Sequence, residues 1–402
     1  MKKMIIVNNN MKVGGVQKSL YNLLWSISDQ YDITLYLFSR KGEYVDQLPE
    51  NVKIESSSSL FRFFGISQSE CEKWSSDYWV RGVLALLCRI LGHKSAVCIA
   101  LASQKHLSEK YDAAISYLQN GRPSALYGGT NEFVLKKINA ERKIAFLHCD
   151  YCQCGADYPA NNRLYYEFDR IAACSEGCRQ SFIKAVPELE AKSTTVKNFH
   201  RYEKIREMAQ DDPLKYESGF FHVVVVGRLA PEKAVDRAIR AAAYAAEKSV
   251  PIVLHIVGDG KMMPRLKQTA DLLKIRERTV FYGEQKNPYR FMANADLLLI
   301  TSYHEAAPMV IDEAYALGIP VLTAETTSSR EMVTERSCGW VCDNSQKGVD
   351  EALVRVLTQP GKLRKKKDAL AKTMADNTEA DRQFKELVGE KSEHESQKIC
   401  GG

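Results

Sequence analysis

The stretch from Asp296 to Thr323 reads DLLLITSYHEAAPMVIDEAYALGIPVLT, and it decides how the rest of the chain is interpreted. Its run Leu297 to Ile300 is continuously apolar, as is typical of a parallel strand that helices cover on both faces. Pro308 suits the first position of a helix, and Gly318 suits the left-handed residue that ends one. The stretch therefore predicts a strand, a turn, a helix over about 308–317 and a second strand.

The start of this helix is a candidate anion site. It lies at the carboxyl end of a strand, where backbone N–H groups and the helix dipole favour negative charge, so a diphosphate would fit there. Glu305 precedes the helix and Glu313 lies inside it, and a carboxylate can accept hydrogen bonds from the vicinal hydroxyls of a ribose. Two glutamates at this spacing mean little alone. The pattern becomes specific because a strand, the small residues Ala306 and Ala307, Pro308 and the Gly-Ile-Pro-Val sequence after the helix occur with them.

A second strong pattern follows the strand predicted over 221–226. The loop reads GRLAPEK and contains Arg228 and Lys233. An arginine can hold phosphate oxygens with two donors, and a lysine adds a point charge, so the loop places two cations beside one anion. The alternative is a solvated loop with surface charges; strand, glycine, arginine and lysine in register favour the phosphate loop.

The first half of the chain has weaker candidates. A strand over 4–7 leads to Gly14 and Gly15, with Gln17 and Lys18 as donors at the start of the next helix. The loop is interpreted as a phosphate or acceptor loop, and a glycine turn that merely joins a strand to a helix is the alternative.

Another predicted strand, over 143–147, ends in His148 and Asp150, where an open α/β sheet carries its site residues. A lone histidine is more often structural, and its place at a strand end favours function. Cysteines lie nearby at positions 149, 152, 154, 174 and 178. They lack the paired spacing of a structural zinc site, so no zinc is predicted.

The segments 221–233 and 296–323 together resemble the donor-binding signature of retaining GT-B glycosyltransferases of the family-4 type, the group 1 enzymes that include bacterial capsule and lipopolysaccharide glycosyl transferases. The resemblance implies an α/β fold of the GT-B type, with two Rossmann-like domains facing across a cleft and a C-terminal helix crossing back to the N-terminal domain. The implied domains are an acceptor-binding domain at 1–200 with a variable insertion at about 55–105, a nucleotide-sugar domain at 201–378, and a terminal helix with a disordered tail at 379–402.

The resemblance also implies roles for single residues. The catalytic residues would be Arg228, Lys233, Glu305 and His148. The donor would be bound by Gly14, Gly15, Gly227, Gly258, Gln285, Ala306, Ala307, Pro308, Met309, Val310 and Glu313. The acceptor would be bound by Gln17, Lys18 and Asp150. Ala234 stands where the family usually has a glycine, which puts the geometry of that turn in question.

The implied reaction moves a sugar from a nucleoside diphosphate donor, a UDP-sugar by preference, to a hydroxyl of a glycan or lipid-linked glycan, with retention, in cell-surface polysaccharide synthesis. Fixed cations would stabilise the leaving diphosphate. The chain has no Asp-x-Asp pair, so no metal or other cofactor is expected. A sugar-nucleotide epimerase or phosphorylase of the same architecture and a degenerate scaffold are alternatives. A dinucleotide oxidoreductase would need Gly-x-Gly-x-x-Gly, which the loop around Gly14 lacks.

The composition limits the number of domains, the cellular compartment and the partners that can be expected. The chain has 402 residues, of which 45% are hydrophobic, enough for two cores. Its eleven cysteines are an odd number without a signal peptide, so reduced thiols in the cytoplasm are expected. No apolar run is long enough to cross a bilayer. A dispersed net charge of +6 argues against nucleic acid and is compatible with anionic lipid or phosphate.

Three segments are less defined. Residues 79–91 are apolar with two arginines, and they predict either a packed helix or one that rests on the inner face of the membrane. Residues 55–76 are rich in serine and predicted to be irregular, and residues 198–218 are charged and predicted to be a linker.

Overall fold

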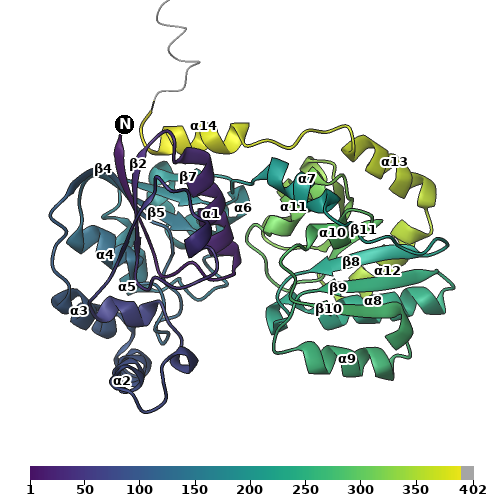
Figure 1. Cartoon of the computed structure of the whole chain (residues 1–402), viewed down its shortest axis with the longest axis horizontal. Coiled ribbons are helices and arrows are strands. Elements are labelled where there is room, and N and C mark those ends of the chain that lie inside the picture. The colour runs from purple at the N-terminus through teal and green to yellow at the C-terminus, as the bar shows by residue number, and fades with distance from the viewer. Residues whose placement is uncertain (391–402) are drawn as a thin grey trace, which may run out of the picture. The chain divides into compact units, whose positions relative to one another are not determined.

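The computed structural model (Figure 1) describes residues 1–390 and divides the chain into two compact units. Of the described residues, unit 1 comprises 1–199 and 377–390, and unit 2 comprises 200–376. The predicted boundaries after residues 200 and 378 lie within two residues of these. The tail predicted to be disordered lies outside the described residues.

Unit 1 contains a parallel sheet of seven strands in the order β3, β2, β1, β4, β5, β6, β7. The strands are β1 (Lys3–Asn8), β2 (Asp32–Leu37), β3 (Lys53–Ser56), β4 (Lys110–Ser116), β5 (Asn139–Leu147), β6 (Arg170–Ala173) and β7 (Ser193–Thr195). The strand order reverses between β1 and β4, and in sheets of this kind ligands bind beyond the carboxyl ends of the strands at that point.

The helices of unit 1 surround this sheet. They are α1 (Gly15–Ile27), α2 (Ser76–Leu91), α3 (His93–Ser103), α4 (Thr130–Lys137), α5 (Pro159–Tyr165), α6 (Glu176–Ala185) and α14 (Thr378–Leu387). The last of these comes from the end of the chain. Its Phe384 is fully buried, with ring centroids 6.1 Å from Tyr31 and 6.2 Å from Phe199. The terminal helix therefore belongs to the N-terminal unit, as predicted.

Unit 2 contains a parallel sheet of six strands in the order β10, β9, β8, β11, β12, β13. The strands are β8 (Phe221–Val226), β9 (Ile252–Val257), β10 (Thr279–Gly283), β11 (Leu297–Ile300), β12 (Val321–Ala324) and β13 (Gly339–Cys342). This is the order of a dinucleotide-binding sheet, with its reversal between β8 and β11. The prediction of two Rossmann-like domains is confirmed.

Two hydrophobic cores cover the two faces of the second sheet. The helices of unit 2 are α7 (Tyr202–Gln210), α8 (Val235–Glu247), α9 (Met263–Leu272), α10 (Tyr289–Met292), α11 (Met309–Ala316), α12 (Gln346–Leu357) and α13 (Pro360–Leu370). Val223 and Leu299 pack in the core that includes α8 and α12, whereas Val224 and Leu298 pack in the core that includes α7 and α11. Because successive strand residues point to opposite faces, the strands must be apolar at every position.

The structure corrects the predicted linker. This segment contains α7, whose Tyr202, Ile205 and Ala209 are buried at helical spacing while most of its other residues are charged. The segment at 55–76 is largely irregular, as predicted, and it contributes buried Phe61 and Phe64 to unit 1. In both cases a few apolar side chains are enough to anchor a polar segment. Within the described residues, no helix has the length and apolar character needed to span a bilayer.

Candidate functional site

A hollow in unit 2 lies where the strand order reverses. It is lined by the ends of β8 and β11 and by the loops that follow them, with Gly227, Arg228, Lys233, Ser302, Glu305 and Val310 among its walls. Both strands end at the same edge of the sheet because they are parallel. The segments 221–233 and 296–323 therefore meet at this hollow.

Three loops at this edge are held together by their backbones. The Gly227 N–H donates to the Val257 carbonyl at 3.0 Å, and the Gly258 N–H donates to the Gly283 carbonyl at 2.8 Å. A Cβ on Gly258, whose φ is +138°, would lie 1.9 Å from the carbonyl oxygen of Gly227. Gly258 thus allows the loops after β8 and β9 to approach closely, a structural role beside the predicted donor contact.

The centre of the site is an ion pair between Lys233 and Glu305. The Lys233 Nζ donates to Glu305 Oε1 at 2.5 Å, and the Ser302 hydroxyl donates to the same oxygen at 2.7 Å. The Glu305 side chain is 11% exposed and that of Lys233 is 31% exposed. An ammonium group has three donors, so Lys233 can hold Glu305 and still donate to a phosphate oxygen.

The two loops are fixed to each other by further bonds. The Thr301 hydroxyl donates to the Ala234 carbonyl at 2.9 Å, and the Tyr303 N–H donates to the Glu232 carbonyl at 3.0 Å. Arg228 stands at the rim, 73% exposed, and donates to Glu232 at 2.9 Å. The Lys233 side chain is thus held in place before a ligand binds, whereas the Arg228 side chain is exposed to solvent.

Ala234 adopts the conformation that its position usually reserves for glycine. Its φ and ψ are 46° and 42°, in the left-handed region, and it directly precedes α8. Side chains with a Cβ adopt this region at a cost. The turn before α8 therefore has the left-handed geometry although Ala234 stands in place of the usual glycine.

The helix predicted at about 308–317 is α11, one residue shorter at each end. Pro308 lies just before the helix, with a ψ of 114°, rather than at its first position. Val310 in the first turn lines the hollow, and Ala306 and Ala307 form the preceding loop. Glu313 is only 3% exposed. The N-terminus of α11 faces the hollow and favours an anion there.

Sequence reasoning missed two residues that position this site. Arg237 in α8 is 3% exposed, and its Nη1 donates to the Thr301 carbonyl at 3.1 Å and to Asn344 Oδ1 at 2.7 Å. Ser302 holds Glu305 directly. The signal for Ser302 was its place two residues after β11, whereas nothing local distinguishes Arg237 within its helix.

Gln285, predicted to contact the donor, lies in the loop after β10. Its side-chain amide donates to the Tyr282 carbonyl at 2.8 Å, which fixes the loop next to Gly283. The structure therefore gives it a local partner and leaves the predicted donor contact open to test.

In unit 1, side-chain contacts through Tyr117 link His148 to α1, the helix that follows the glycine loop. Ser19 in α1 is 2.7 Å from the Tyr117 hydroxyl, and the Tyr117 ring centroid is 4.6 Å from that of His148. The Gln119 side chain accepts from the His148 N–H at 3.0 Å. Burial lowers the pKa of His148 to about 3, so the ring is neutral at physiological pH.

The glycine loop leaves room beside α1. Gly14 has an extended backbone with φ 175°, and a Cβ on Gly15 would meet no atom within 4 Å. The fold itself therefore does not demand glycine at position 15. Gln17 and Lys18 lie in the first turn of α1, as expected.

Asp150 and the neighbouring thiols take part in local structure. Asp150 Oδ1 accepts from the Ser181 hydroxyl at 2.6 Å and from the Gln153 N–H at 3.1 Å, which closes a turn. Cys149 and Cys154 have their sulfur atoms 3.0 Å apart. Within the part of the chain that the structure describes, no group of three or more His, Cys, Asp or Glu side chains is arranged to hold a metal ion.

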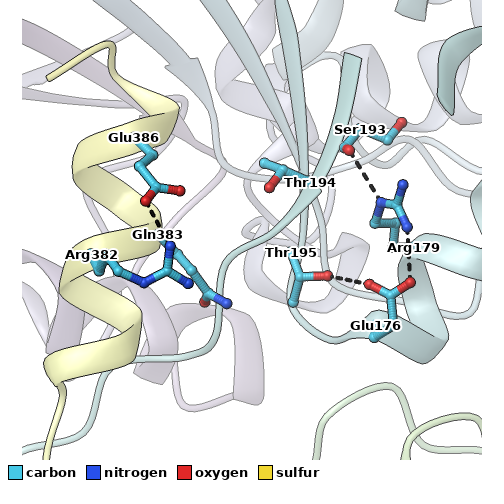
Figure 2. Close-up of a pocket in the computed structure, with 8 residues that line it drawn as sticks. All are labelled: Glu176, Arg179, Ser193, Thr194, Thr195, Arg382, Gln383 and Glu386. Atoms are coloured by element: carbon cyan, nitrogen blue, oxygen red, sulfur yellow. Dashed lines mark hydrogen bonds and ion pairs between the residues drawn. The ribbon is translucent and has the colours of Figure 1, made fainter. Parts of the chain in front are cut away.

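A larger hollow, of about 310 Å³, lies on unit 1 between α6, β7 and α14 (Figure 2). Its charges pair with one another. Arg179 donates to Glu176, and Arg382 donates to Glu386 at 2.6 Å. Since the two sequence motifs line the smaller hollow of unit 2 and not this one, the smaller hollow is the candidate site.

Residues 209–374 match the model of the family described as glycosyl transferases group 1. The lipopolysaccharide glucosyltransferase WaaG of Escherichia coli is 36% identical over 138 residues, which are 33% of this chain and 36% of WaaG. The N-acetyl-alpha-D-glucosaminyl L-malate synthase of Bacillus anthracis is 25% identical over 64% of this chain and 69% of that enzyme. The chain thus matches little more than a third of the length of WaaG.

The fold is also found in solved structures. Anabaena HepE in complex with UDP superposes with a TM-score of 0.66 at 17% identity, over 96% of this chain and 99% of that one. At this level of identity the likeness concerns the fold, which is of the GT-B type.

Proposed function

We propose that this chain, whose residues 209–374 match the family model of the glycosyl transferases group 1, moves a sugar from a nucleoside diphosphate sugar to a hydroxyl of a glycan or lipid-linked glycan. The observation that carries the proposal is the pairing of Lys233 with Glu305 in the hollow at the strand reversal of unit 2. UDP is the favoured nucleotide, because HepE, which shares the fold, has been solved with UDP.

The chemistry needs positive charge where the sugar–phosphate bond breaks. Negative charge then grows on the leaving diphosphate, and fixed donors aimed at it lower the barrier. Lys233 and Arg228 would supply two cations, and the first turn of α11 would supply N–H groups. Glu305 holds the lysine in place and would accept a hydroxyl of the donor sugar, while Glu313 would bind the ribose.

Retention of the anomeric configuration is part of the proposal. The acceptor hydroxyl would attack on the face from which the diphosphate leaves and would give its proton to the leaving phosphate oxygen. No protein base is then required, and the two cations stand where other transferases use a divalent ion. His148, Gly14 and Gly15 would contribute to the donor from unit 1, and Gln17, Lys18 and Asp150 would contact the acceptor.

The setting we propose is cell-surface polysaccharide synthesis, such as that of a capsule, at the cytoplasmic face of the membrane. An acceptor linked to lipid would require the enzyme to work at a bilayer surface.

A thermal-shift panel of UDP-, GDP-, ADP- and CMP-sugars tests the proposed function. A donor that binds only the folded chain stabilises it by about 2.7 kcal/mol at a hundredfold excess over its Kd. We expect one nucleotide class to raise the Tm of the wild type and to fail with Lys233→Ala. Lys372→Ala, a change at an exposed lysine of unit 2, should respond as the wild type does.

Failure of all four classes to raise the Tm, or an equal rise with Lys233→Ala, would contradict the proposal. Incubation of the stabilising donor with and without glycan acceptors then distinguishes transfer from epimerisation, because an epimer would form without an acceptor.

A further inference from the structure

Helix α2 carries an apolar stripe that faces solvent. Trp79, Val83, Leu86 and Ile90 are spaced so that they share one face of the helix. Their exposed fractions are 55%, 55%, 55% and 69%. Most water-soluble helices turn such a stripe toward the core, so the exposure of four large side chains in a row indicates a binding surface.

The opposite side of α2 already attaches the helix to unit 1. Only Leu84 and Cys88 of its sixteen residues are buried. Arg81 points inward, and its Nε donates to the Ile66 carbonyl at 2.9 Å. Figure 1 shows α2 at the rim of unit 1, below the sheet. The apolar stripe is therefore not needed to hold the helix in place.

Aromatic side chains enlarge the stripe at the start of the helix. Trp74 is 74% exposed, and its ring centroid is 5.7 Å from that of Trp79 and 6.3 Å from that of Tyr78. Tryptophan and tyrosine combine an apolar body with a polar tip, and they are enriched where a membrane meets water. This cluster is suited to the headgroup level of a bilayer.

The charges around the stripe are mostly basic. Residues 73–94 contain four basic side chains, at 73, 81, 89 and 94, and one acidic side chain, at 77, a net of +3. Asp77 is paired with Arg62 at 2.6 Å. Lys73, Arg89 and Lys94 are exposed, and no salt bridge of the described residues involves them. A basic rim around an apolar stripe complements an anionic lipid surface.

We propose that this surface, defined by Trp74, Trp79, Val83, Leu86 and Ile90 with its basic rim, docks unit 1 onto a bilayer that contains anionic lipids. The apolar side chains enter the interface, and Lys73, Arg89 and Lys94 contact the headgroups. A second copy of the chain is a poorer occupant, because a symmetric contact would bring two basic rims together. The donor site in unit 2 takes no part in the docking.

Vesicle co-sedimentation of the full chain tests the proposal. The key variant is Val83→Gln/Leu86→Gln/Ile90→Gln, since glutamine keeps helix propensity while removing apolar surface. The matched control is Leu272→Gln on α9 in unit 2, where the leucine is 75% exposed. We expect the wild type to bind phosphatidylcholine vesicles with added phosphatidylglycerol, the triple variant to lose at least about tenfold in partitioning, and the control to stay within about twofold.

A second variant examines the charges. Arg89→Gln/Lys94→Gln should reduce the preference for anionic over neutral vesicles, and higher salt should do the same to the wild type. Unchanged partitioning of the triple variant would overturn the proposal. So would a wild-type dimer in light scattering that becomes a monomer in the triple variant, because the stripe would then bind a second copy.

Two measurements keep this result separate from other failures. The circular dichroism spectrum of each variant reports whether the chain is folded. The donor-induced rise in Tm reports on the site of unit 2. A wild type that binds vesicles but no donor would therefore contradict the proposed function and support the proposed membrane surface.

Discussion

The two sheets share one strand order over six strands, yet the carboxyl ends of their strands carry different chemistry. At the strand reversal of unit 2 the loops present charge, with Arg228, Lys233 and Glu305 in one hollow. At the corresponding strand ends of unit 1 the buried side chains are uncharged, with Asn8 and Asn9 buried at the end of β1 and a histidine whose pKa burial lowers to about 3, while Lys18 and Asp150 lie on the segments that follow the strands. The same strand order thus carries an ion pair at one site and buried neutral groups at the other.

In unit 1 the loops at these strand ends are held by uncharged groups, although Asn8 Oδ1, Asn9 Oδ1 and His148 Nε2 are buried without a hydrogen-bond partner among the described residues. The Asn9 side chain donates to the Phe64 carbonyl at 3.0 Å, and the Ser116 hydroxyl donates to Asn131 Oδ1 at 2.7 Å. These bonds fix the loops after β1 and β4. In unit 2 the equivalent fixing is done by an ion pair that a ligand can share, so that edge is the more sensitive to single substitutions.

The largest expected effect is at Lys233. Lys233→Ala should lower kcat/KM for sugar transfer by about 10²–10³, the range seen when a fixed donor to a developing anion is removed. The matched change in unit 1, His148→Gln, should cost only about tenfold, because a neutral ring has no charge to offer the leaving group. Initial rates with the stabilising donor measure both. Equal losses would remove the proposed contrast between the two edges.

An intermediate effect concerns acid stability in unit 2. His222 donates through Nε2 to the Glu217 carbonyl, so its Nδ1 accepts from His255, which in turn accepts from the Tyr282 hydroxyl at 2.9 Å. Burial, together with His222, lowers the pKa of His255 to about 3. The folded chain therefore resists protonation, and this stability is complete above about pH 6.5 and is lost as the pH falls toward 3.

Between pH 7 and pH 5, His255 should contribute about 2 kcal/mol to the loss of unfolding free energy. Urea titrations of the wild type and His255→Gln measure it, and the variant should lose less stability over that interval. An identical pH dependence in both proteins would show that another group accounts for the acid sensitivity.

The smallest effect is at the turn before α8. Ala234→Gly should relieve a left-handed strain of about 1–2 kcal/mol, offset by about 0.8 kcal/mol for the buried methyl group, so a net gain of about 0.5 kcal/mol is expected. Ala230→Gly, at an extended position with φ −118°, is the control and should not stabilise. A stability loss in Ala234→Gly would mean that packing of the methyl group outweighs the strain.

Single elements of this chain show which structural features can be predicted from a sequence. The strands predicted at 221–226 and 297–300 coincide with β8 and β11, because each is a short apolar run closed by a turn. The helix α7 was missed since only three of its nine residues are buried and the rest resemble a charged linker. For α2, periodicity alone could not tell which face was buried, and the structure turns the apolar stripe outward.

The sequence by itself predicted two Rossmann-like units, through the family resemblance of the segments 221–233 and 296–323, and it predicted an anion site after the strands that the structure shows as β8 and β11, because local patterns of apolar, small and charged residues encode strands, turns and helix starts. Only the tertiary structure decided that Lys233 meets Glu305, that Ser302, Thr301 and Arg237 fix that pair, and that His148 is neutral. These facts depend on contacts between segments dozens of residues apart, and the distance between such segments is set by how the sheet orders its strands.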